Sequence, residues 1–184
     1  SHSLAEALQN DLGKIYAENQ VREPFAPNAQ QAGQRALANT ILNLTTRLDG
    51  GIQARKQFET SDNMTSTLGA LGALLSCDYG VNAAAQFYQT WKHERLVIDE
   101  WFRIQMTHAK PEDALDVVDI LSAHADFSLR NPNRFRSVFR PFAAHAGFHA
   151  TDGRGYEKLA DWLIKLDQLN PQPTARTCIA FDSW

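Results

Sequence analysis

Apolar residues recur every three or four positions along most of the chain, a spacing that places them on one face of a helix. No segment keeps the alternation of apolar and polar residues that is typical of a strand. Prolines and glycines interrupt the pattern at short intervals. It predicts about ten helices, over residues 3–19, 28–48, 52–60, 64–77, 81–92, 96–106, 111 onward, 132–145, 152 or 155 to 169, and 171 onward.

The helical spacing also selects the residues that we expect in the core. They include Leu4, Leu8, Leu12, Ile15 and Tyr16 in the first helix and Ala36, Leu37, Thr40, Ile41 and Leu44 in the second. Either Leu121 or Ile120 completes the buried face of the helix that begins at Pro111. Asp62 is the expected N-cap of helix 64–77, because its carboxylate can accept a hydrogen bond from a free backbone N–H.

A repeated Asn-Pro dipeptide indicates that the predicted helices recur at a regular spacing along the sequence. Asn131-Pro132 and Asn170-Pro171 both fit a helix start, since Asn caps the first turn and Pro fits it without losing a hydrogen bond. The two copies lie about 40 residues apart, the length of one HEAT-like helix pair. We therefore predict an all-α fold, an α-solenoid or superhelix of about ten antiparallel helices in HEAT-like pairs, in a single domain over residues 1–184.

The composition limits the binding partners and the cellular location that we expect for the protein. With 184 residues, a net charge of −3 and a pI near 6.0, nothing indicates a nucleic-acid or membrane partner. Cys77 and Cys178 lie far apart, the first residues do not have the pattern expected of a signal peptide, and there is no run of about 20 apolar residues. We expect a cytoplasmic location. Both chain ends interrupt a helical pattern, so we also expect a piece of a longer protein.

The sequence offers little chemistry of its own. His93-Glu94 begins like a zinc-protease helix, but Val97 occupies the place of the second histidine ligand. We find no glycine-rich phosphate loop and no group of nucleophile, base and orienting residue. We therefore expect no metal site and no catalytic residue in these 184 residues.

An arginine cluster is the main exception. Arg130, Arg134, Arg136 and Arg140 surround Asn133 at the start of a predicted helix. A helix N-terminus already carries partial positive charge, so these arginines favour an anionic partner or carboxylates elsewhere in the fold.

The helix repeat extends this cluster. Arg176 follows Arg136 by 40 residues, and equivalent positions of stacked repeats share a face. We select Asn133, Arg134, Arg136 and Arg176 as candidate binding residues; ordinary salt bridges are the alternative.

Four sequence blocks resemble a known family. They are Asp-Asn-Met-Thr at 62–65, Phe-Tyr-Gln-Thr-Trp at 87–91, Asn-Pro-Asn-Arg-Phe-Arg-Ser at 131–137 and Phe-His-Ala-Thr-Asp-Gly-Arg-Gly-Tyr at 148–156. In this order they resemble the C-terminal helical domain of bacterial alanyl aminopeptidases (aminopeptidase N type) of the M1 zinc metallopeptidase family. The similarity extends from about Arg35 to Arg176.

The resemblance implies a non-catalytic domain of a zinc aminopeptidase that releases N-terminal residues from peptides. This domain would cap the active site and shape the chamber through which peptides enter. The zinc ion and the catalytic residues would lie in an upstream catalytic domain of the same polypeptide, and this chain alone would be inactive. Arg136 and Arg176 match family arginines that face the chamber, where they could hold a substrate carboxylate.

Two other functions remain open at this point. A free-standing HEAT- or armadillo-like scaffold that binds a protein partner would have the same helical pattern. An enzyme complete within these residues would need a catalytic group that the sequence does not display.

Overall fold

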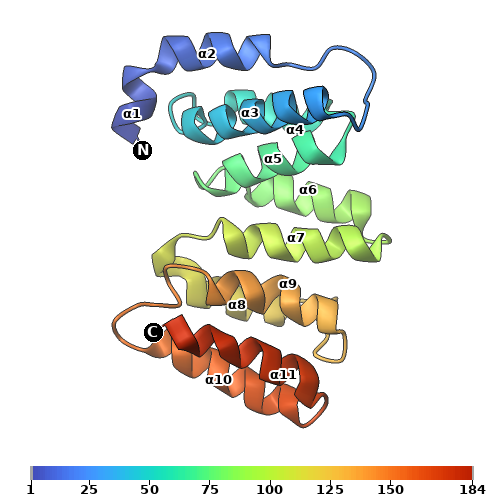
Figure 1. Cartoon of the computed structure of the whole chain (residues 1–184), viewed down its shortest axis with the longest axis vertical. Helices are drawn as coiled ribbons and strands as arrows, with labels where there is room; N and C mark the ends of the chain where they lie inside the picture. Colours follow the sequence, from blue (N-terminus) through green and yellow to red (C-terminus); the bar gives the residue numbers. More distant parts are fainter. Residues whose placement is uncertain (1, 184) are drawn as a thin grey trace. The chain divides into compact units, whose positions relative to one another are not determined.

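The computed structural model describes residues 2–183 and confirms the all-α class. Within this range the chain forms eleven α-helices and two short 3₁₀ helices, and no strand occurs (Figure 1). None of the helices in the described range is long and apolar enough to span a membrane.

The contacts between residues divide the chain into two compact units, Ser1–Gln89 and Thr90–Trp184. The division falls within α6 (Val81–Trp91). Each unit has its own buried apolar residues. The single domain expected from the sequence stays a prediction, and the units are described separately below.

In the first unit, α3 and α5 form the central packing layer (Figure 1). Helix α5 also packs against α4, and α2 packs against α3. The bounds of the unit's helices are α1 His2–Ala7, α2 Gln9–Glu18, α3 Ala29–Thr45, α4 Ile52–Thr60 and α5 Met64–Leu75. Gly69 lets α5 approach α3 closely, because a Cβ at this position would collide with the Asn39 side chain.

In the second unit, α9 lies against both α7 and α8, and α10 packs against α11 (Figure 1). The bounds are α7 Arg95–Thr107, η1 Pro111–Asp113, α8 Ala114–Ser122, α9 Pro132–Ala143, α10 Arg154–Asp167, α11 Pro171–Thr177 and η2 Cys178–Ser183. Its core is rich in aromatic side chains. Those with no exposed surface are Phe102, Phe135, Phe139, Phe142 and Phe148.

The structure corrects the predicted first helix. The chain bends at Leu8, where φ is −107° and ψ is 11°, so α1 and α2 are separate helices. Of the residues predicted for the core face of that first helix, Tyr16 is buried and Leu12 is half-buried, whereas Leu4, Leu8 and Ile15 are exposed and Ala5 is buried instead.

The predicted buried face of α3 is only partly right: Ile41 is buried and Leu44 is half-buried, but Ala36, Leu37 and Thr40 are exposed. Leu37 is 43% exposed, and the helix instead buries a face that includes two polar residues. The buried residues of α3 are Gln31, Arg35, Ala38, Ile41 and Leu42. The polar members of this face are accommodated because the loop before α3 supplies hydrogen-bond partners for them.

Two local predictions are settled as well. Asn63, not Asp62, caps α5, since its side chain accepts a hydrogen bond from the Ser66 N–H at 2.9 Å. In α8, Leu121 is buried, whereas Ile120 is 69% exposed.

Candidate functional site

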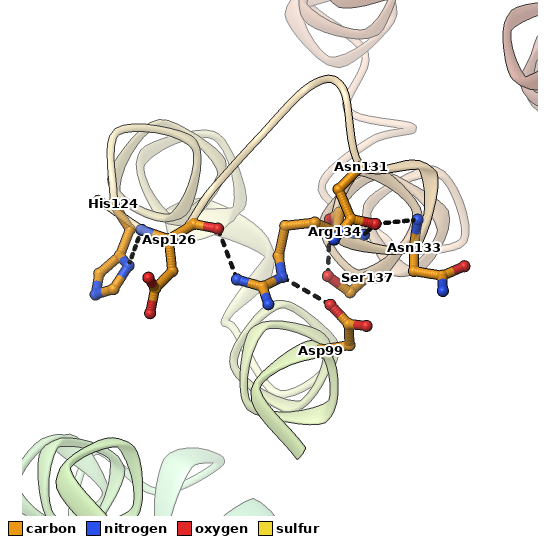
Figure 2. A network of polar contacts seen from close by, with 7 residues as sticks. All are labelled: Asp99, His124, Asp126, Asn131, Asn133, Arg134 and Ser137. Atoms are coloured by element: carbon orange, nitrogen blue, oxygen red, sulfur yellow. Dashed lines mark hydrogen bonds and ion pairs between the residues drawn. The ribbon is translucent and has the colours of Figure 1, made fainter. Parts of the chain in front are cut away.

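The first Asn-Pro dipeptide starts α9 as predicted. The Asn131 side-chain oxygen accepts hydrogen bonds from the backbone N–H groups of Asn133 and Arg134, at 3.1 and 3.4 Å (Figure 2). Asn170 occupies the N-cap position of α11, but its side chain makes no capping hydrogen bond. The predicted helix start is therefore confirmed at both sites, whereas the side-chain cap occurs only at Asn131.

Arg134 is a buried residue that joins three segments of the second unit. Its Nε donates to a carboxylate oxygen of Asp99 on α7 at 2.7 Å, and its Nη1 donates to the backbone oxygen of Asp126 at 2.6 Å (Figure 2). The guanidinium carbon lies 4.7 Å from the centre of the Phe102 ring. These contacts satisfy the buried charge within the fold, so Arg134 fastens α9 to α7 and to the preceding loop.

Asn133 contributes its backbone, not its side chain, to the same network (Figure 2). The residue is exposed at the start of α9. Neither Asn133 nor Arg134 lines the cavity that contains the other two candidates.

Arg136 and Arg176 line one cavity of about 460 Å³ in the second unit. Arg140, one helical turn after Arg136, lines it too, and all three residues are exposed. The remaining lining residues are small or apolar: Ala143, Ala144, Pro173, Thr177, Ile179 and Ala180. The structure thus brings together two of the four selected residues and adds Arg140, which sequence reasoning placed in the cluster but did not select.

The cavity has the chemistry of an anion site. No carboxylate lines it, and none of the three arginines forms an ion pair within the described range. A guanidinium presents parallel N–H donors that match the two oxygens of a carboxylate. The other lining side chains are small or apolar, so the cavity has room for more than a free anion. The three guanidinium groups can bind the terminal carboxylate of a peptide or of another ligand with an apolar part.

The two histidines near the end of α9 take part in local structure. His145 Nε2 donates to the backbone oxygen of Ala109 at 3.0 Å, while its Nδ1 accepts from the Gly147 N–H at 3.1 Å. His149 Nδ1 lies 2.8 Å from the Tyr156 hydroxyl. Among the described residues, no group of three or more His, Cys, Asp or Glu side chains is arranged to hold a metal ion.

Comparison with known proteins places this chain in the class of ARM-repeat domains. The family described as "Domain of unknown function (DUF3458_C) ARM repeats" matches residues 1–184, and the chain belongs to this family. The ARM repeats confirm the predicted helical solenoid.

Three curated relatives are called Aminopeptidase N. The protein from Haemophilus influenzae is 35% identical over 182 residues, which cover 94% of this chain and 20% of the relative. The Caulobacter vibrioides protein is 34% identical over 98% of this chain and 22% of its own length. The Escherichia coli protein is 33% identical over 96% and 21%. The chain therefore spans about a fifth of the length of these relatives.

A solved structure has the same fold over the whole chain. The crystal structure of Legionella pneumophila aminopeptidase A in complex with aspartic acid matches with a TM-score of 0.89 and 29% identity, covering 100% of this chain and 23% of that one. Together, these matches confirm the resemblance to the C-terminal helical domain of bacterial aminopeptidases.

Proposed function

We propose that this chain is the non-catalytic C-terminal domain of an M1 zinc aminopeptidase. In this role it caps the active site and shapes the chamber through which peptides reach it. The proposal is supported by the relatives named Aminopeptidase N, in which the matching region occupies about a fifth of the length. The partner of the domain is then the catalytic domain of the same polypeptide, and the enzyme is cytoplasmic.

The arginine cavity is the observation that supports a direct role in substrate handling. Arg136, Arg140 and Arg176 line it without carboxylate partners of their own within the described range. A short peptide without acidic side chains has one anionic group far from its reacting end, the C-terminal carboxylate. The cavity would hold that group through charge-assisted hydrogen bonds and so orient the peptide in the chamber.

The catalytic domain would supply the chemistry. There, a bound Zn²⁺ polarises the scissile carbonyl and activates a water molecule. The residues of this chain contribute positioning: they bind the far end of the peptide and limit which peptides enter. By itself the chain is then expected to release no alanine from an alanyl chromogenic substrate.

The role of the arginines is testable in the complete aminopeptidase that the proposal implies. Arg136→Ala should raise KM for a tripeptide by about tenfold, because one charge-assisted interaction is lost, and should leave KM for an alanyl amide without a carboxylate unchanged. Arg130→Ala is the matched control, since Arg130 is also exposed but lines a different cavity. Equal effects of Arg136→Ala on both substrates would contradict the proposed contact.

The aminopeptidase proposal and the free-standing scaffold alternative predict different coding sequences upstream of Ser1. If the aminopeptidase proposal is right, the coding sequence upstream of Ser1 contains His-Glu-x-x-His and, further on, a ligand Glu. A reading frame that begins near Ser1 would favour a free-standing protein-binding scaffold instead.

A further inference from the structure

The first unit contains a polar cavity that the proposed function does not use. Its volume is about 290 Å³, and the segment between α2 and α3 forms one wall. Hydroxyl and amide groups of α4, α5 and the turn between them form much of the rest, including Gln57, Ser61, Asn63 and Ser66. The volume of the cavity is near the lower end for small-molecule pockets, and its polar lining can hydrogen-bond a polar ligand.

Arg35, on α3, lines this cavity and is only 6% exposed. Its Nη1 donates to the Gln31 side-chain oxygen at 3.1 Å, and its Nη2 has a long contact of 3.5 Å with the Ala26 backbone oxygen. The guanidinium carbon lies 4.8 Å from the centre of the Phe25 ring. All of these partners are uncharged.

The Nε of Arg35 is buried and has no hydrogen-bond partner. Among the described residues, no Asp or Glu forms an ion pair with Arg35. Nε and Nη2 form the edge of a guanidinium that pairs with the two oxygens of a carboxylate. Along this edge, Arg35 therefore has one orphaned donor and one donor with only a long contact.

A buried arginine charge is costly unless an anion balances it. The charges at the cavity indicate which anion fits. Arg22, Glu23 and Asp62 also line the cavity, and neither acidic side chain forms an ion pair with Arg35. A group with one negative charge is therefore favoured over a doubly charged phosphate, which the two acidic side chains would repel.

We propose that the cavity beside Arg35 is a carboxylate-binding site, in which the Nε–Nη2 edge of Arg35 holds the two oxygens of the ligand. The carboxylate comes either from the C-terminus of a small acid or peptide or from an acidic side chain. Phe25, which is 50% exposed and lies over the guanidinium, also lines the cavity and would be in contact with the bound ligand.

NMR titration of the isotopically labelled 184-residue chain tests this site. The reporters are the Arg35 Nε–H, assigned through its contacts with the Phe25 ring, and the backbone N–H of Ala26, which donates to Gln31. The probes are N-acetylalanine, whose only charge is an α-carboxylate, and N-acetyl-aspartic acid α-amide, whose only charge is the side-chain carboxylate. Sodium chloride at equal ionic strength is the reference.

At least one probe should move the Arg35 Nε–H downfield along a saturating curve, and the probe that binds at the lower concentration identifies the source of the carboxylate. Arg35→Lys should weaken binding about tenfold or more, measured at Ala26, because Lys cannot form the bidentate pair. Arg55→Lys is the matched control: Arg55 is exposed in the same unit and does not line the cavity.

The proposal is overturned if neither probe shifts the Arg35 signal more than chloride does. It is also overturned if Arg35→Lys, folded by its amide spectrum, binds the probe as tightly as the original chain. Should Arg35→Lys fail to fold, the titrations of the unaltered chain still decide between these outcomes.

Discussion

Two buried arginines, one in each unit, have similar surroundings but differ in one partner. Arg35 on α3 and Arg134 on α9 each lie over a phenylalanine ring, at 4.8 and 4.7 Å, and each follows an asparagine N-cap. Arg134 has the carboxylate of Asp99 at 2.7 Å, whereas Arg35 has no carboxylate partner within the described range. One fold thus contains an arginine whose charge is balanced internally and one whose charge is not.

The difference separates a structural arginine from a binding one. The Arg134 side chain is 6% exposed and that of Asp99 is 16% exposed, so both charges of the pair are shielded from water. Such a pair joins two helices, and neither member is available to an external ligand. Arg35 is equally inaccessible but keeps an orphaned Nε, which is the group that a ligand can satisfy.

Asp99→Ala should have the largest effect, because it would make Arg134 resemble Arg35. Removing one partner of a shielded pair leaves the other charge buried, and we expect a loss of about 3 kcal/mol in the free energy of unfolding. Urea unfolding followed by circular dichroism measures this loss.

The matched control for that experiment is Asp119→Ala. Asp119 pairs with Lys158 at 2.8 Å, but its side chain is 56% exposed, so the expected loss is below about 1 kcal/mol. If both variants lose the same stability, the Asp99–Arg134 pair is not the internal clamp described above.

Replacement of each arginine by methionine should show the next largest difference. Arg134→Met removes the bond to Asp99 and should cost about 2 kcal/mol, since Asp99 can be partly hydrated afterwards. Arg35→Met removes an unbalanced buried charge together with its bonds to uncharged partners, and we expect a net change within about 1 kcal/mol. Urea midpoints of the two variants compare them directly, and a larger loss for Arg35→Met would make Arg35 the more structural residue.

The helix caps should show the smallest effects and no difference between the two regions. Asn28 accepts from the Gln31 N–H at 2.8 Å, much as Asn131 accepts at the start of α9. Asn28→Ala and Asn131→Ala should therefore each lower stability by about 1 kcal/mol. Asn170→Ala should cost only a few tenths, because Asn170 makes no side-chain cap. Thermal unfolding in one buffer tests the order, and an equal cost at Asn170 would contradict it.

Hydrophobic periodicity and turn residues predicted the helices, since both act over a few neighbouring positions. The Asn131-Pro132 helix start followed from such local signals, although the predicted first helix is two helices, α1 and α2, in the structure. Most of the buried face of α3 did not follow from them, because the prediction chose inward residues among Ala36, Leu37, Thr40, Ile41 and Leu44 and did not include the polar Gln31 and Arg35. They nevertheless lie at the spacing of a buried face with Ala38 and Leu42, and burial was made possible by carbonyl and amide partners in the preceding loop.

Among the candidate binding residues, too, some were predicted by local sequence signals and others were not. The 40-residue repeat related Arg136 to Arg176, and the structure places both at one cavity. The repeat gave no indication that Arg134 pairs with Asp99, 35 residues away, because pairing between helices depends on their packing and not on sequence spacing. Arg35 was marked in the sequence only as the start of the family similarity.

The most direct test of the difference between the two arginines is the proton chemical shift of their Nε–H groups in one spectrum of the unliganded chain. The Arg134 proton donates to Asp99 at 2.7 Å and should appear clearly downfield of the Arg35 proton, which has no acceptor. Addition of a bound carboxylate should then move only the Arg35 signal toward that of Arg134. Equal downfield shifts before any addition would show that Arg35 already has an anionic partner and would contradict the account.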